Sequence, residues 1–447
     1  MKNKLFYLIS VACFLSYTGT FTSCVNGVDD EYLEQKITDD GEDNKKGEEL
    51  PDLNGDYSIE GDFDLELTCN GEVLNGKKVI LSVDENNETA SFTFAAAQTD
   101  LETAIATAIP GGVGGLVSGW GLKYTGNSPV PGQKEIIVAN VPLYRNGPEN
   151  YIFEGENIEP TYAMTFKGKI EGEKMTVDVN YELTNQKLAG TWYRADMSQS
   201  GAISNHAPLW IDWKTDNQLD LSAVYSGLKG TPNTIFGTLD SFLFSETVMN
   251  LLIGKKIKFN QVIYNLLEYV AAEPNGSMYA SYSYNPDIAV AGPYSTKDTY
   301  NVLRYYYDLE KPDERIYLEL NSDFLINMIG SLGTTLTRST RADDGDLRDK
   351  AKALIKLLVP VLEQGIPCEY TLDGEKLIIN IDGIVLKDIL TKLAIVANDP
   401  DANSYIDGAL TSLGDTKPII MQLIKDLPTT LGDNCEYVKL GFRFVRK

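Results

Sequence analysis

The chain has 447 residues, 43% of them hydrophobic, and a formal net charge of −25. This length and composition allow two or three globular domains, each with a core of its own. The strong negative charge repels phosphate backbones and anionic headgroups, which argues against nucleic acid as a partner and against a basic patch as the means of membrane binding.

Residues 1–23 have the features of a secretory signal sequence. Lys2 and Lys4 precede a short apolar run, and small residues follow it. Residues 21–24, which end in Cys24, resemble a lipoprotein lipobox. The resemblance implies cleavage before Cys24 and lipid on its sulfur, so we expect the membrane to be a partner through an acyl anchor on Cys24.

Residues 24–50 are polar and rich in acidic side chains. They carry too little apolar surface to offset the entropy of ordering, which predicts a disordered tether. The acidic cluster after Cys24 resembles the export signal of some Bacteroidetes lipoproteins. It implies an outer-membrane lipoprotein exposed at the cell surface, with a periplasm-facing anchor as the alternative.

Three cysteines follow the tether: Cys69, Cys368 and Cys435. They show no Cys-x-x-Cys spacing, so neither a metal cluster nor a redox motif is indicated. Secretion would permit one disulfide, for which Cys368 and Cys435 are the expected pair. Three buried free thiols are the equal alternative.

An internal repeat divides the rest of the chain. Residues 53–57 are similar to 188–192, and residues 171–179 are similar to 373–381, in the same order. This predicts two copies of one domain, over 51–186 and 187–447.

Alternation of apolar and polar residues predicts strands in both copies. In the first copy it covers residues 63–67, 79–83, 90–94, 161–166 and 175–179. The second copy adds apolar residues at helical spacing, which predict helical insertions at 240–254, 259–270, 346–365, 384–397 and 418–427. The expected class is mainly β with helical insertions (α+β).

Gly190, Thr191 and Trp192 resemble the Gly-x-Trp signature of lipocalins and other calycin barrels. In that family the Trp closes the base of the barrel beneath a basic residue of the last strand, which implies Arg443 or Arg446 as the partner of Trp192. The first copy departs from the signature with Tyr57. The chain resembles calycin-like lipoproteins of gut Bacteroidetes, which implies two tandem calycin-like antiparallel β-barrel or sandwich domains, the second elaborated with helices.

No residue pattern nominates a catalytic set, a metal site or a cofactor. His206 is the only histidine and lies in a turn-like stretch, where an exposed loop position is the simpler interpretation. Residues 399–407 place oxygen ligands at calcium-loop spacing, but they lack the turn glycine and the terminal acid. A connection between helices is therefore favoured there, and no metal or cofactor is expected.

Aromatic side chains next to charges are the candidate ligand-binding residues. Alternation puts them on shared faces of their strands: Trp210 with Asp212, Tyr282 with Tyr284, Arg304 with Tyr306, and Tyr317 with Glu319. Rings beside carboxylates and an arginine suit stacking on sugars or anchoring a protein loop. The alternative is that tyrosine simply favours half-buried strands.

We therefore expect a lipid-anchored cell-envelope lipoprotein that is not an enzyme. It would bind a glycan, a small hydrophobic molecule or a protein through its β domains. The alternatives are a carboxylate-dependent glycan hydrolase and a structural accessory subunit of an outer-membrane complex.

Overall fold

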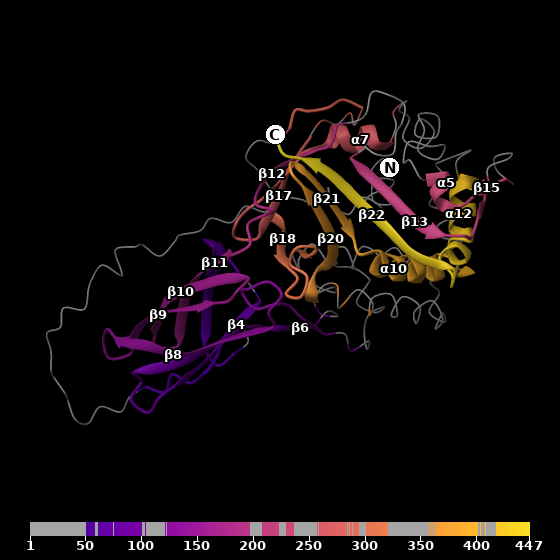
Figure 1. The fold of residues 1–447 in the computed structure, drawn as a ribbon. Helices are drawn as coiled ribbons and strands as arrows, with labels where there is room; N and C mark the ends of the chain where they lie inside the picture. The colour runs from indigo at the N-terminus through magenta and orange to yellow at the C-terminus, as the bar shows by residue number, and fades with distance from the viewer. Residues whose placement is uncertain are drawn as a thin grey trace.

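The computed structural model describes most of residues 51–100, 121–196, 208–236, 257–320 and 361–447, with shorter gaps inside these ranges. The signal sequence and the tether with Cys24 lie outside the described residues, as do the expected helix at 240–254 and most of the one at 346–365. The described chain is mainly β and forms two nine-stranded sheets (Figure 1).

The first sheet is curled around an apolar core. A bridge between Tyr57 and Phe63 links β1 to the start of β2, and β2 pairs in parallel with β11. The first eight strands of this sheet, from β1 to β2, therefore meet at their two ends. In spatial order the strands are β1 (Gly55–Tyr57), β4 (Lys77–Val83), β5 (Thr89–Ala96), β8 (Glu135–Arg145), β9 (Asn150–Ile158), β10 (Tyr162–Glu171), β11 (Lys174–Leu183), β2 (Asp64–Cys69) and β3 (Glu72–Val73). Strands β6 (Gln98–Asp100) and β7 (Lys123–Thr125) pair separately.

The second sheet contains a closed barrel of eight antiparallel strands. Closure comes from β12, which pairs with β16 on one side and with β22 on the other. In order the strands are β12 (Gly190–Arg194), β16 (Leu267–Ala272), β17 (Ser277–Tyr282), β18 (Asn301–Tyr307), β19 (Arg315–Leu320), β20 (Ile366–Asp373), β21 (Lys376–Ile381) and β22 (Cys435–Val445). β13 (Leu209–Thr215) is the ninth strand and extends along β22, while β14 (Leu219–Asp220) and β15 (Lys229–Gly230) form a separate pair.

Both sheets begin with seven strands in the same spatial order, and the two similar sequence segments lie at matching places. Gly55 opens β1 and Gly190 opens β12. The sixth and seventh strands of each sheet are joined by a tight turn with a glycine at positive φ, +59° at Gly172 and +57° at Gly374. The eighth position differs, because β22 fills it antiparallel to β21 whereas β2 fills it parallel to β11.

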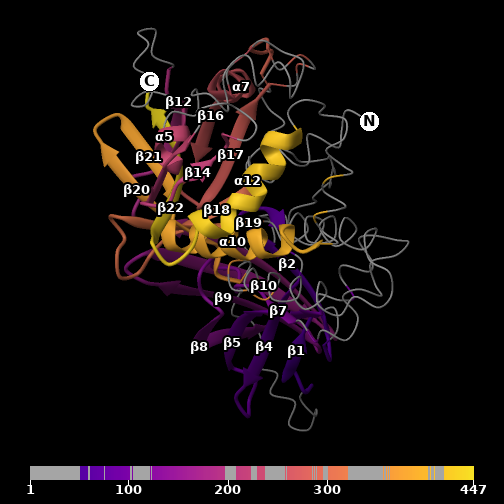
Figure 2. The same cartoon turned by 90° about the vertical axis from the view of Figure 1, so that its right-hand side faces the viewer.

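The described residues of the second sheet are accompanied by the helices α5 (Pro232–Phe236), α7 (Phe259–Leu266), α10 (Gly383–Ala397) and α12 (Lys417–Thr430). The side chain of Asp382 caps α10 by accepting from the amides of Ile384 and Val385, and α10 packs against β22 and α12 (Figure 2). The expected helix at 259–270 is correct only as far as Leu266. Residues from Leu267 onward form β16, because pairing with both β12 and β17 overrides the helical spacing.

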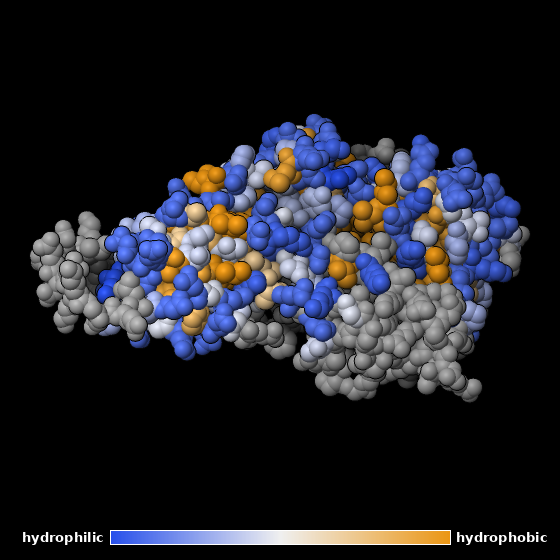
Figure 3. Space-filling view, turned by 90° about the horizontal axis from the view of Figure 1, so that it is seen from below, coloured by the Kyte–Doolittle hydropathy of each residue, from blue (hydrophilic) through white to orange (hydrophobic). Residues whose placement is uncertain are grey.

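The two sheets share one apolar core cluster. The Leu183 amide, at the end of β11, donates to the Pro274 carbonyl between β16 and β17 at 2.9 Å, and the Leu188 amide, between β11 and β12, donates to the Tyr307 hydroxyl at 3.2 Å. Hydrophilic residues cover much of the described surface seen in Figure 3, with hydrophobic ones in small groups. Among the described residues, no helix has the length and apolar character needed to cross a membrane.

Candidate functional site

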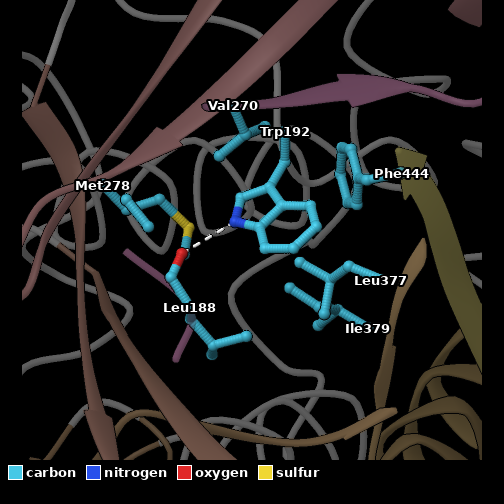
Figure 4. A pocket seen from close by; sticks show the side chains of 8 residues that line it. Leu188, Trp192, Val270, Met278, Leu377, Ile379 and Phe444 are labelled. Atoms are coloured by element: carbon cyan, nitrogen blue, oxygen red, sulfur yellow. Dashed lines mark hydrogen bonds between the residues drawn. The ribbon is translucent and has the colours of Figure 1, made fainter. Parts of the chain in front are cut away.

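Trp192 lies on β12, the strand that closes the barrel, and is 2% exposed. Its indole Nε1 donates to the Leu188 carbonyl at 2.7 Å (Figure 4). The guanidinium carbon of Arg446 lies 4.2 Å from the centroid of the Trp192 ring, and Arg446 Nη2 donates to the Ala189 carbonyl at 2.9 Å. Of the two arginines considered from the sequence, Arg446 is the one that stacks on Trp192.

Gly190 makes room for this stack. Its φ is +128°, and a Cβ added there would lie 3.3 Å from Arg446 Nη2. A larger residue would therefore strain the backbone and press on the guanidinium.

The first sheet repeats the hydrogen bond that Trp192 makes in the barrel. Tyr57 occupies the position of Trp192, is fully buried, and donates from its hydroxyl to the Leu53 carbonyl at 3.1 Å. In both sheets the ring donor therefore bonds to the carbonyl four residues earlier. The change from Trp to Tyr keeps that bond.

The barrel interior beside Trp192 is packed. A cavity of about 10 Å³ is lined only by apolar residues: Leu188, Trp192, Val270, Ala272, Met278, Leu377, Ile379 and Phe444 (Figure 4). That volume holds about one water molecule. This end of the barrel therefore has no room for a small-molecule ligand.

The β18–β19 face brings together three of the expected ligand-binding residues. Tyr306 lies opposite Tyr317, and their rings stack with centroids 5.0 Å apart and planes at 10°. Arg304 lies opposite Glu319 two pairs further along, on the same face of the sheet. We use the name β18–β19 face for these four side chains, which point away from the barrel core.

A loop of the first sheet, residues 126–134 between β7 and β8, packs on this face. Arg304 Nη2 donates to the Pro129 carbonyl at 3.2 Å, and Asn127 Nδ2 donates to Glu319 Oε1 at 3.2 Å. Gly132 has φ +80° and lies so close to the Tyr306 ring that a Cβ would approach it to 2.4 Å. We call residues 126–134 the bridging loop. Through these contacts the bridging loop binds to the β18–β19 face.

Ionisable groups gather beneath the bridging loop. Lys77 Nζ donates to the Asn127 carbonyl at 2.7 Å; its enclosure lowers its pKa, an effect that nearby Glu319 opposes. Burial raises the pKa of the Cys69 thiol, and Arg304 acts in the other direction. Burial, and then Glu319, also raise the pKa of Tyr306, whose hydroxyl donates to the Gln364 carbonyl.

Trp210 and Asp212 lie on a second face of the barrel, formed with β22. Asp212 accepts from the Tyr437 hydroxyl at 3.0 Å and from Asn233 Nδ2 at 2.8 Å. The Arg443 guanidinium carbon lies 5.2 Å from the Trp210 ring centroid. We use the name β13–β22 face for Trp210, Asp212, Tyr437, Arg443 and Lys439.

This second face continues onto β20 and β21 through charged and amide side chains. Lys439 Nζ lies 2.5 Å from Glu369 Oε2, and Asn380 Nδ2 donates to the same oxygen at 3.1 Å. The Lys439 and Glu369 side chains are 27% and 39% exposed. A strip of half-exposed rings and charges therefore runs across the outer side of the barrel.

The remaining expected residues lie elsewhere. Tyr282 is on β17, opposite Leu267, and belongs to neither face. Tyr284 lies outside the described residues, as do His206 and much of 399–407. The described candidate ligand-binding residues therefore lie on two separate faces, apart from Tyr282, which lies on β17.

All three described cysteines are buried free thiols. The disulfide between Cys368 and Cys435 is not formed, and the alternative of free thiols is the one observed. Cys368 lies inside the barrel, where burial raises its pKa, while Cys435 joins a small cluster with Trp213, Ala394, Leu431 and Val438.

Sequence reasoning missed the residues that complete the β18–β19 face. Asn127, Pro129 and Gly132 lie in a stretch with two prolines and a glycine, which is typical of a fixed turn. That signal indicates a rigid loop but not which strand the loop contacts. Lys77 lies outside the strand predicted at 79–83 and is not among the residues singled out from the sequence.

Comparisons with protein-family models, with curated proteins and with solved structures found no match. Within the part of the chain that the structure describes, no group of three or more His, Cys, Asp or Glu side chains is arranged to hold a metal ion.

Proposed function

We propose that this protein is a lipid-anchored lipoprotein of the cell envelope that acts by binding, and that its ligand contacts the β13–β22 face. The observation that carries the proposal is the difference between the two faces. The β18–β19 face binds a loop of the same chain, whereas within the described residues the hydrogen bonds of Asp212, Glu369 and Lys439 stay within the second sheet and its helices.

The side chains of the β13–β22 face suit a polar ligand that carries flat apolar patches. An indole stacks on the apolar face of a sugar or on a peptide loop, while the neighbouring carboxylate, ammonium and phenol form directional hydrogen bonds. We therefore propose a glycan or an exposed loop of a partner protein as the ligand. The packed interior beside Trp192 makes a small hydrophobic ligand the weaker choice.

We further propose that the chain holds two calycin-like domains, over 51–186 and 187–447. Two features support this: the shared order of seven strands, and the matching hydrogen bonds of Tyr57 to Leu53 and of Trp192 to Leu188. In this proposal Cys24 carries the lipid and residues 24–50 extend the domains from the outer membrane, at the cell surface or, as the alternative, facing the periplasm.

A glycan array probed with the full-length, detergent-solubilised protein tests the binding proposal. Trp210→Ala is expected to reduce binding at least tenfold, because stacking on a ring contributes about 1.5 kcal/mol or more. Tyr144→Ala is the matched control, since Tyr144 is an exposed aromatic residue on β8 of the first sheet.

The proposal that the ligand is a partner protein is tested with the same two variants. Cross-linking in intact cells should capture a discrete partner with wild type and Tyr144→Ala, and lose it with Trp210→Ala. Equal glycan binding and equal cross-linking by both variants would contradict the assignment of this face.

A further inference from the structure

Arg194 is a buried charge at the end of β12. Only 9% of the residue is exposed. It follows Trp192 by two residues, so strand alternation places it on the same, interior face of the barrel, opposite Phe444 of β22. It thus lies on the interior side of the strand that closes the barrel, beyond Trp192.

The guanidinium is held by neutral groups. Nη1 donates to the Glu268 carbonyl at 3.3 Å and Nη2 donates to the Tyr294 hydroxyl at 3.3 Å. The ring of Tyr264, from α7, lies 3.8 Å from the guanidinium carbon, and the Tyr294 ring lies at 5.7 Å. None of these groups carries a negative charge.

Glu268, on the neighbouring strand β16, carries the carboxylate beside Arg194, but that carboxylate forms its hydrogen bond elsewhere. Glu268 Oε2 accepts from the Ser281 hydroxyl at 2.7 Å, and Arg194 forms no ion pair with any residue of the described chain. Arg194 Nε is buried and has no hydrogen-bond partner. Of the five N–H groups of a guanidinium, only two are therefore used.

Buried charges in proteins are normally paired, because removing an ion from water is unfavourable unless an opposite charge replaces the solvent. Stacking on tyrosine rings compensates only part of that cost. The free Nε edge of Arg194 has the fork geometry that takes a carboxylate or phosphate through two parallel hydrogen bonds. A missing anion accounts for both the unpaired charge and the unused donors.

We propose that Arg194 is the anchor of a binding site for a small oxyanion, a carboxylate or a phosphate, enclosed by Tyr264 and Tyr294. The cavity further inside, beside Trp192, measures about 10 Å³, so the ligand has no long apolar tail in that direction. Tyr264 lies on α7, so this helix forms part of the proposed site. This site is distinct from the β13–β22 face, and neither proposal depends on the other.

Thermal unfolding of the full-length protein tests the site with sodium phosphate and sodium acetate, each compared with sodium chloride at equal ionic strength. Wild type is expected to gain roughly 2–4 °C at saturation with at least one oxyanion. Arg194→Met should show no saturable shift. Arg194→Lys should show a smaller one, because an ammonium cannot form the two parallel bonds.

Arg145→Met is the matched control and should respond as wild type does, because Arg145 lies on the exposed end of β8 and donates to the Gly147 carbonyl at 3.1 Å. A shift with acetate alone identifies a carboxylate ligand, and a shift with phosphate alone identifies a phosphate. If no oxyanion differs from chloride, or if Arg194→Met keeps the full shift, the proposal is wrong.

A second measurement does not depend on how well the variants fold. In wild-type protein, one arginine Nε–H NMR signal should move saturably as the active oxyanion is added, because Nε gains a hydrogen-bond acceptor. Absence of any such movement, even with a thermal shift, would show an adventitious ion only and would overturn the assignment to Arg194.

Discussion

The β18–β19 face and the β13–β22 face carry similar side chains on the outer side of one barrel. Each combines aromatic rings with an arginine and a carboxylate. The first binds the bridging loop of the other sheet, through Arg304 to Pro129 and through Asn127 to Glu319. The second is paired mainly within its own barrel, as Asp212 with Tyr437 illustrates.

This comparison shows that composition alone does not distinguish an internal interface from an external binding surface. Among the described residues, a loop of the first sheet packs on the β18–β19 face, whereas the hydrogen bonds of Asp212 and Lys439 stay within the second sheet and its helices. On that basis, changes at the β18–β19 face should lower stability, and changes at the β13–β22 face should mainly alter binding.

The largest effect is expected for Gly132→Ala. The new Cβ would lie 2.4 Å from the Tyr306 ring at φ +80°, and the predicted loss in the free energy of unfolding is about 3 kcal/mol. Gly71→Ala is the control, because φ there is +81° but no atom lies within 4 Å of the Cβ position. It should lose only about 1 kcal/mol in urea denaturation. Equal losses would mean that the contact with Tyr306 is unimportant.

Glu319→Gln should have the next largest effect. Glu319 lies opposite Arg304, accepts from Asn127 and opposes the lowering of the Lys77 pKa, so removing its charge leaves two cations together. We predict a loss of about 2 kcal/mol in urea denaturation at pH 7. A loss below that of Asp212→Asn would reverse the proposed ranking of the two faces.

Tyr306→Phe should change how stability depends on alkaline pH. Burial raises the pKa of Tyr306 above its ordinary value of 10, so its contribution is fully present below pH 10 and is lost as pH rises above it. Between pH 9 and pH 11 the wild type should lose about 1.4 kcal/mol more than the variant. The measurement is urea denaturation at both pH values, and parallel losses in the two proteins would contradict the enclosure of this ring.

Asp212→Asn should have the smallest effect on stability. The side chain is half exposed, and an amide oxygen can still accept from Tyr437, so about 0.5 kcal/mol is expected. Ligand binding by the β13–β22 face should nevertheless weaken, because the charge is lost. A large loss of stability with unchanged binding would identify this face as structural too.

Much of the β architecture could be predicted from sequence, because alternation reports directly which side of a strand faces a core. The two hairpin turns were also predictable, since Gly172 and Gly374 follow acidic residues between alternating segments. The strand β16 was not: Leu267 and Val270 continue the helical spacing of α7, and only pairing with β12 and β17 decides their conformation.

The candidate site was predictable only in part. Alternation places Arg304 and Tyr306 on one face, and stacking with Tyr317 follows once β18 and β19 pair. Contact with Gly132 could not be predicted, because it joins positions more than 170 residues apart without any local signal. Likewise, Arg194 appears in the sequence as an ordinary strand residue, and the burial of its Nε without a hydrogen-bond partner is a property of the packed structure.

Hydrogen–deuterium exchange of the full-length protein tests most directly whether the β18–β19 face is an internal interface. The amides of Thr125, Ser128 and Gln133 donate to Glu363, Gln133 and Val130, so a peptide covering 123–134 should be protected nearly as strongly as β18 and β19. Gly132→Ala should remove that protection, and Gly71→Ala should not. Exchange of the wild-type bridging loop as rapid as that of the exposed hairpin at 146–149 would contradict the account.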